Sequence, residues 1–153
     1  MIFMSFDDRS LRTVGCGDLY EILADLVDRR LLGALELSCE GERRGYVNVS
    51  VELVAALITH AAAISGKADF TTVSLLFTDE KMTLTIRGVG ESAASELARL
   101  ARLGITAGFD SRYEGGRLVL SAPVRSSATL KIYAVKPAWL RALFEKYARK
   151  NIL

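Results

Sequence analysis

A helical pattern of apolar residues runs from Val51 to Ser65 (VELVAALITHAAAIS). Its large apolar residues recur at the spacing of one buried helix face, which predicts a helix over this stretch. The opposite face carries one carboxylate among small residues, where a solvent-exposed helix normally carries Lys, Arg and Glu. We therefore expect both sides of the helix to be covered, the second by a ligand, a lid or another chain. The apolar face holds Leu53, Val54, Leu57, Ile58, Ala61 and Ile64, and the small face Glu52, Ala56, Thr59 and Ala63.

The rest of the chain alternates between helical and extended patterns, except for residues 1–14, which give no clear pattern. Gly33 and Gly104 mark helix ends, and Pro137 suits the first turn of a last helix. Pro123 indicates the end of a strand or a sheet edge. Helices are predicted over 18–30, over 95–103 and from 137 onward, and strands over 34–39, 70–77, 82–86, 106–113, 117–124 and 129–135, with a short extended piece at 46–49.

Strands that are joined in hairpins and also separated by helices predict an α+β fold. We expect a two-layer α/β sandwich in which helices cover one face of a mixed sheet. The length of 153 residues suits a single domain over residues 1–153. Half of the residues are hydrophobic and a quarter are charged, which is ordinary for a globular protein.

The formal net charge of +2, from 20 basic and 18 acidic residues, gives no general attraction to nucleic acid or acidic lipid. Neither a nucleic-acid partner nor a membrane is therefore expected. Cys16 and Cys39 lack the spacing of a disulfide framework or a metal site, and we expect reduced thiols in a cytoplasmic protein. The start of the chain does not fit a signal peptide, and no apolar run reaches the ~18 residues of a membrane helix.

Three features occur in one order along the chain: the helix ELVAALITHA, a hairpin leading into GVG, and the stretch LARLARLG-ITAGFDSRYEGGRLVLSAP. This order resembles the ATP-binding domain of the histidine-kinase-like ATPase superfamily, which includes gyrase, the Hsp90 chaperones, mismatch-repair proteins and anti-sigma-factor kinases. The resemblance covers residues 18–124, and residues 125–153 add a C-terminal strand and helix. Gly104, Gly115, Gly116 and Pro123 stand where the kinases have a helix-ending glycine, a glycine turn and a proline after the last strand.

The side chains that contact nucleotide in this superfamily are replaced here. An Asn of the central helix supplies an oxygen to Mg²⁺ in the family, and its position is Ala56, whose methyl group cannot coordinate a metal. The Asp that accepts a hydrogen bond from adenine corresponds to Ile86. The glycine-rich lid is also short, with only about ten residues (ESAASELARL) after Gly90 before the next match.

Four residues would form a nucleotide site if one remained. Glu52 matches an acid that activates water in many members, while Gly88 and Gly90 match the glycines beside the base, and Gly104 stands in the last glycine motif. The simpler interpretation of Glu52 is a first-turn acid that the helix dipole favours. His60 is the only histidine, so the chain lacks a phosphoaccepting histidine on a preceding dimerisation helix.

We therefore expect a non-catalytic regulatory or scaffold protein with a degenerate histidine-kinase-like ATPase fold, which acts through a protein partner or as a homodimer. No cofactor and no metal are expected, and ATP is not expected to bind. The small face of the central helix would be closed by a rearranged 87–96 loop or by another subunit. One alternative is a divergent ATP-binding protein or anti-sigma-factor-type serine kinase, and another is an unrelated α+β domain that converged on this order of elements.

The segment after the family match carries too much apolar area to stay exposed on a soluble monomer. We expect residues 125–153 to dock, the strand at an edge of the same domain and the helix either there or on a second subunit. The large apolar residues concerned are Leu130, Ile132, Tyr133, Trp139, Leu140, Leu143, Phe144 and Tyr147.

Overall fold

The computed structural model describes residues 11–29, 36–41, 44–64, 70–88, 91–114 and 116–152. Within these residues seven strands form two sheets. The strands are β1 (Leu11–Gly15), β2 (Glu36–Gly41), β3 (Tyr46–Ser50), β4 (Phe70–Phe77), β5 (Lys81–Gly88), β6 (Asp110–Glu114) and β7 (Arg117–Pro123). The larger sheet has the order β2-β4-β5-β7-β6, and β1 pairs with β3. Because β2 runs parallel to β4 and the other neighbours are antiparallel, the larger sheet is mixed, as predicted.

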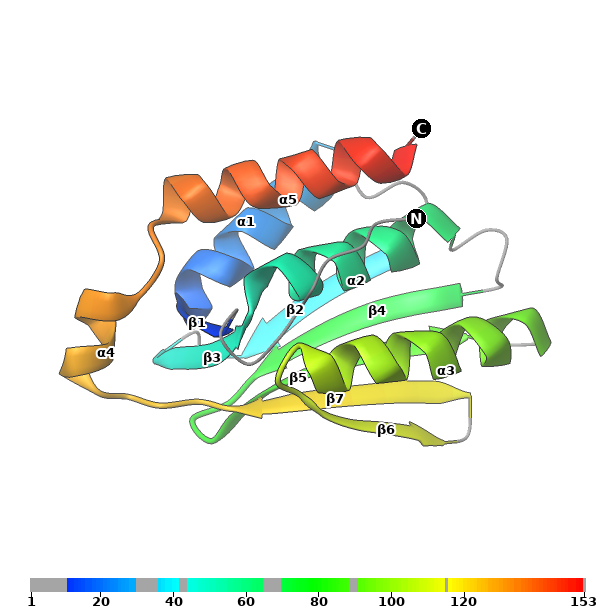
Figure 1. Ribbon diagram of the computed structural model, residues 1–153, viewed down its shortest axis with the longest axis horizontal. Helices are drawn as coiled ribbons and strands as arrows, with labels where there is room; N and C mark the ends of the chain where they lie inside the picture. Colours follow the sequence, from blue (N-terminus) through cyan, green and yellow to red (C-terminus); the bar gives the residue numbers. More distant parts are fainter. Residues whose placement is uncertain are drawn as a thin grey trace.

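The helices gather on one face of the larger sheet (Figure 1). They are α1 (Cys16–Asp28), α2 (Val51–Ile64), α3 (Glu91–Thr106), α4 (Ala128–Tyr133) and α5 (Pro137–Ile152). α3 packs on β5, β6 and β7, α1 contacts β2, and α5 lies on α1 and α2 as an outer layer. The short helix α4 lies beside β1 at the end of the molecule. This arrangement confirms an α+β fold with helices on one face of a mixed sheet.

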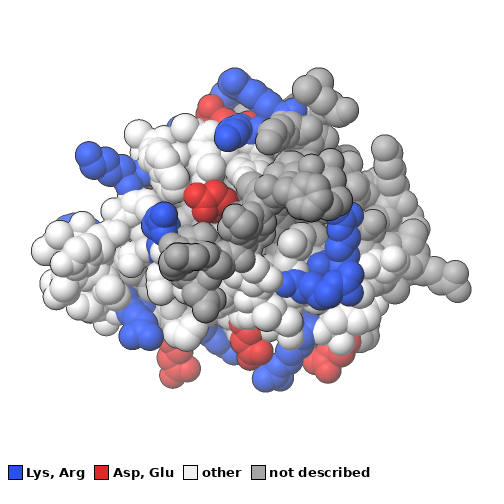
Figure 2. Space-filling view, in the orientation of Figure 1, with Lys and Arg blue, Asp and Glu red and all other residues white. Residues whose placement is uncertain are grey.

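The alternation of residues in the central strands sets the two faces of the sheet apart. In β5, Met82, Leu84 and Ile86 are buried under the helices, while Thr83 and Thr85 between them are only half-buried. Alternate side chains of a strand point to opposite faces, so one face of the sheet builds the core and the other is open. On the surface shown in Figure 2, basic and acidic side chains occur together, in keeping with the small net charge.

The central helix was predicted closely, since α2 spans Val51–Ile64. Its apolar face is buried, with Leu53, Leu57 and Ile58 at most 1% exposed. Ala55 and Thr59, which lie off that face, are also buried, so the helix is covered on more than one side, as its composition predicted.

The predicted strand over 129–135 is wrong, because these residues form the helix α4. Ser127 caps it: its side-chain oxygen accepts a hydrogen bond from the Thr129 N–H at 3.3 Å. An alternating segment becomes a strand when one face is buried against a sheet, but Ile132 and Tyr133 are 79% and 71% exposed. The alternation in this segment therefore had no buried face to occupy.

Residues 125–152 nevertheless dock on their own chain. Arg125 and Tyr46 exchange two backbone hydrogen bonds of 2.8 Å, and the Val135 N–H donates to the Thr13 carbonyl at 2.8 Å. Two backbone connections to the small β1–β3 sheet therefore hold the segment on either side of α4.

Two boundaries and one strand also differ from the sequence prediction. Gly104 does not end its helix, because α3 continues to Thr106, and the strand predicted over 106–113 begins only at Asp110. A Cβ atom at Gly104 would meet the Leu120 Cδ2 at 2.3 Å, so this glycine allows close packing of α3 on β7. The strand β1 lies in the stretch that gave no clear pattern.

The C-terminal helix is fixed to α1 and α2 by an apolar stripe and an ion-pair cluster. Leu140, Phe144, Tyr147 and Ala148 are each at most 4% exposed. At the surface, Arg29 of α1 bonds Glu145 at 2.7 Å and Asp25 at 3.4 Å, and Arg141 bonds Asp25. Exposed ion pairs contribute only about 0–1 kcal/mol each, so the apolar stripe supplies most of the binding energy of α5.

Replacing Phe144 by Ala should lower the free energy of unfolding by about 3–5 kcal/mol, since it leaves a cavity between α5 and the helices beneath it. Urea denaturation followed by circular dichroism measures this change. The matched control is Tyr133→Ala, a second aromatic truncation on an exposed side chain, which should change stability by no more than about 0.5 kcal/mol. Equal effects of the two substitutions would show that α5 is not packed as described.

Burial of the first residue of α1 predicts a loss of stability at alkaline pH. Desolvation raises the pKa of the Cys16 thiol from 9.0 to about 11. The unfolded thiol ionises first, so the free energy of unfolding should fall as the pH rises from about 9 to about 11, by at most about 2–3 kcal/mol from this group.

Urea denaturation from about pH 8 to about pH 11 measures this slope. Cys16→Ala should reduce it, whereas Leu19→Ala, which also truncates a buried side chain of α1 but removes no titrating group, should preserve it. The assignment fails if Cys16→Ala retains the full slope.

Candidate functional site

The two positions that correspond to the metal-binding Asn and the adenine-binding Asp present only hydrocarbon. Ile86 is 0% exposed and lies between Val73 of β4 and Leu118 of β7 in the sheet register. Ala56 is half-buried and packs against the hydrophobic core. Neither side chain can accept a hydrogen bond or coordinate a metal.

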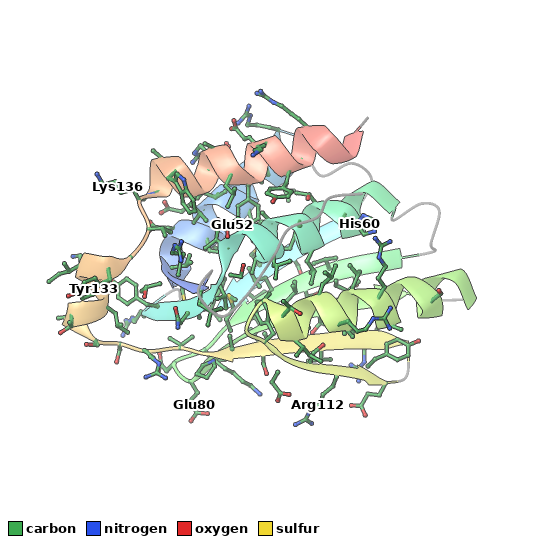
Figure 3. The ribbon with its side chains drawn as sticks, viewed as in Figure 1. Glu52, His60, Glu80, Arg112, Tyr133 and Lys136 are labelled. Carbon is green, nitrogen blue, oxygen red and sulfur yellow. The ribbon has the colours of Figure 1, made fainter. Side chains whose placement is uncertain are left out.

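Glu52 stands in the first turn of α2 and is half-buried (Figure 3). The negative charge of Glu52 acts on a tyrosine of the C-terminal helix. The pKa of Tyr147 is raised above its ordinary value, first by burial of the phenol and then by the negative charge of Glu52. The charge of this acid therefore acts on a buried side chain of α5.

The C-terminal helix α5 of the same chain packs along α2. Closure of the small face by a rearranged 87–96 loop or another subunit stays a prediction, and Glu52 and Ala56 on that face are half-buried. Residues 89 and 90 of the loop lie outside the described residues, and residues 91–96 begin α3.

The glycines of the expected site serve the packing of the sheet. The Gly88 N–H donates to the Gly116 carbonyl at 3.0 Å, which joins the ends of β5 and β7. Gly116 has a φ of +75°, so the predicted turn between β6 and β7 uses the left-handed conformation that glycine adopts readily. Gly104 packs on Leu120, and Gly90 lies outside the described residues.

Of the four candidate residues, Gly88 bonds Gly116, Gly104 contacts Leu120, and the charge of Glu52 helps to raise the pKa of Tyr147. Sequence reasoning missed Tyr147 as a neighbour of Glu52. The apolar stripe of the last helix predicted that Tyr147 is buried but did not indicate which helix it contacts.

The single histidine and the acidic residues that the structure describes do not form a metal site. His60 is half-buried towards the end of α2 (Figure 3). Across the part of the chain that the structure describes, no three His, Cys, Asp or Glu residues gather in a way that suits a metal ion. Over the same residues, no helix combines the length and the apolar character needed to cross a membrane.

No protein-family model and no curated protein sequence matches the chain. Among solved structures the chain is similar to the ATP binding domain of PrrB from Mycobacterium tuberculosis, with 18% identity, a TM-score of 0.50, and coverage of 76% of this chain and 99% of that one. It is also similar to the cytoplasmic segment of histidine kinase QseC, with 10% identity, a TM-score of 0.45, and coverage of 76% and 79%. The chain therefore has the histidine-kinase-like ATPase fold, as its sequence resemblance predicted.

The electrostatic effect of Glu52 on α5 can be tested through the titration of Tyr147. Glu52→Gln removes a negative charge beside the phenol, so the pKa of Tyr147 should fall, while burial should keep it above the ordinary tyrosine value. NMR of ¹³Cζ-labelled tyrosine measures this pKa, with Tyr147→Phe to assign the signal. Glu80→Gln, in the turn between β4 and β5, is the matched charge-removal control and should leave the signal unchanged. An unchanged pKa in Glu52→Gln would place α5 away from the acid.

Proposed function

We propose that this chain is a non-catalytic regulatory or scaffold protein of the cytoplasm that uses a histidine-kinase-like ATPase fold without nucleotide turnover and acts through protein contacts. The observation that carries the proposal is the hydrocarbon at Ala56 and Ile86. In the resembling kinases those two positions hold the metal and the adenine.

The energetic argument rests on the polar contacts that are missing. A buried hydrogen bond or charged contact contributes roughly 1–3 kcal/mol when its partner would otherwise be left unsatisfied. Adenine placed against Ile86 would lose its acceptor, and a magnesium ion beside Ala56 would lose a protein oxygen. The loss of both contacts removes several kcal/mol, which corresponds to a factor of 100 or more in affinity, at about 1.4 kcal/mol for each tenfold change.

The role of Glu52 follows the same logic. A general base needs a metal-bound phosphate and a water molecule to act on. The carboxylate is instead half-buried, and its charge helps to raise the pKa of the buried Tyr147 phenol. We infer that Glu52 is retained as a first-turn acid of α2 and not as a catalytic group.

A protein partner or a second copy of the chain is the binding class that we propose. Support comes from apolar side chains at the surface of the C-terminal segment: Ile132 and Tyr133 on α4 and Trp139 in the first turn of α5, which is 44% exposed. Large exposed apolar and aromatic side chains are typical of protein–protein contact sites.

Isothermal titration of the intact chain with ATP and Mg²⁺ tests the absence of nucleotide binding. We expect no heat of binding at micromolar concentrations, because the metal and base contacts are missing. The ATP binding domain of PrrB, titrated under the same conditions, shows that the assay detects binding. Micromolar binding that is lost in Glu52→Ala would overturn the proposal in favour of a divergent ATP-binding protein or serine kinase.

A further inference from the structure

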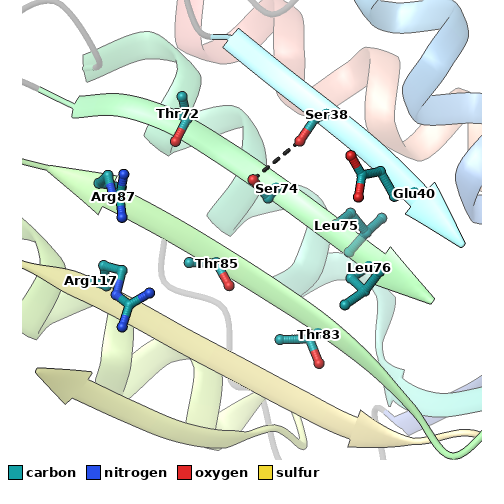
Figure 4. A pocket seen from close by; sticks show the side chains of 10 residues that line it. All are labelled: Ser38, Glu40, Thr72, Ser74, Leu75, Leu76, Thr83, Thr85, Arg87 and Arg117. Atoms are coloured by element: carbon teal, nitrogen blue, oxygen red, sulfur yellow. Dashed lines mark hydrogen bonds between the residues drawn. The ribbon is translucent and has the colours of Figure 1, made fainter. Parts of the chain in front are cut away.

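A hollow of about 350 Å³ lies on the open face of the larger sheet, on the side away from the helices (Figure 4). Its volume falls within the ~300–1,000 Å³ of small-molecule sites. The hollow extends over β2, β4, β5 and β7 and is separate from the positions that correspond to a nucleotide site. The lining side chains on this face are Ser38, Glu40, Thr72, Ser74, Leu76, Thr83, Thr85, Arg87 and Arg117.

The shape of the hollow follows from the lengths of its side chains. Short hydroxyl side chains occupy its middle, and in the register Ser38 pairs with Ser74, which pairs with Thr85. The Ser38 hydroxyl donates to the Ser74 hydroxyl at 3.2 Å. The solvent face of a sheet usually carries long charged residues, which would fill this space. The row of hydroxyls instead leaves a polar floor between longer side chains.

Two arginines stand together at one end of the hollow (Figure 4). Arg87 of β5 and Arg117 of β7 are direct cross-strand partners. On its other side, Arg87 pairs with Thr72 of β4. Like charges at directly opposite positions destabilise a sheet. Glu114 of β6 pairs with Arg117 in the same row and offsets one of the two positive charges. The cross-strand row therefore holds two positive charges and one negative charge, and the hydroxyl group of Thr72 lies at its other end.

The other end of the hollow has a different character. Glu40 of β2 and Leu76 of β4 are direct partners there, and both are exposed. The hollow thus has a basic end, a floor of hydroxyl groups and an end with one carboxylate acceptor. A ligand that matches this pattern carries an anionic group on a body of hydroxyl groups.

We propose that this hollow binds a small phosphorylated molecule rich in hydroxyl groups, of the sugar phosphate class. The phosphate lies between the guanidinium groups of Arg87 and Arg117, because paired guanidiniums bind phosphate oxygens through charge-assisted hydrogen bonds. The hydroxyl groups of the ligand bond the serine and threonine floor, and one of them donates to Glu40. This site does not depend on the function proposed above, because it uses the opposite face of the sheet.

The test is an NMR titration of the intact ¹⁵N-labelled chain with glucose 6-phosphate, glucose and inorganic phosphate as separate probes. Glucose 6-phosphate should shift the amide signals of Thr72, Thr85 and Arg117, and it should bind more tightly than inorganic phosphate because the floor adds hydrogen bonds. Glucose alone should give much smaller shifts. Arg117→Gln and Arg87→Gln should each weaken binding of glucose 6-phosphate by about tenfold or more, since a charge-assisted contact is lost.

Arg112→Gln is the matched control, because it removes the same charge from an exposed strand position on β6, outside the hollow. It should weaken binding by less than about twofold. Far-UV circular dichroism of each variant checks that the fold is retained. The proposal is overturned by an absence of shifts at about 10 mM glucose 6-phosphate, by equal shifts with glucose, by equal affinity for inorganic phosphate, or by an equal loss in Arg112→Gln.

Discussion

The fold depends on the burial of α2 from two directions. The large apolar face of α2 is buried in the core, and α5 packs along the helix as an outer layer. Buried alanines such as Ala55 of α2 allow a neighbouring helix to approach closely. Burial of one large side chain contributes roughly 1.5–3 kcal/mol, so Leu140, Phe144 and Tyr147 stabilise the layer considerably.

Much of this architecture follows from local sequence patterns. The helical periodicity of Val51–Ile64 and the hairpin of β4 and β5 depend on residues that are close in the sequence. Both elements were therefore predicted closely. The short alternation in residues 129–135 is ambiguous, because a strand and a helix differ there only in what lies beside them. The Ser127 cap and the exposure of Ile132 and Tyr133 favour the helix. β1 is stable through its pairing with β3, a contact that local sequence does not show.

Part of the candidate site could likewise be predicted from the sequence, and part of it could not. The hydrocarbon at Ala56 and Ile86 is visible in the sequence once the order of motifs is noticed, and the structure places Ile86 in the core. The electrostatic effect of Glu52 on Tyr147 could not be predicted from the sequence, because it depends on how the C-terminal helix docks. The hollow on the open face was also missed, since it depends on the register that aligns Arg87 with Arg117.

The packing of α5 on α2 also sets an energetic condition on any ligand that would have to displace this helix. A molecule that displaced α5 would expose Leu140, Phe144 and Tyr147 to water, at a cost of about 5–9 kcal/mol. A ligand that binds with micromolar affinity gains only about 8 kcal/mol in total. The displacement would therefore consume most or all of the binding free energy of such a ligand, even if every polar contact were present. The open face of the sheet carries no such cost, because no described helix has to move before its hollow is filled. The same layering that closes one face of the fold thus leaves the other as the accessible surface for a small polar ligand.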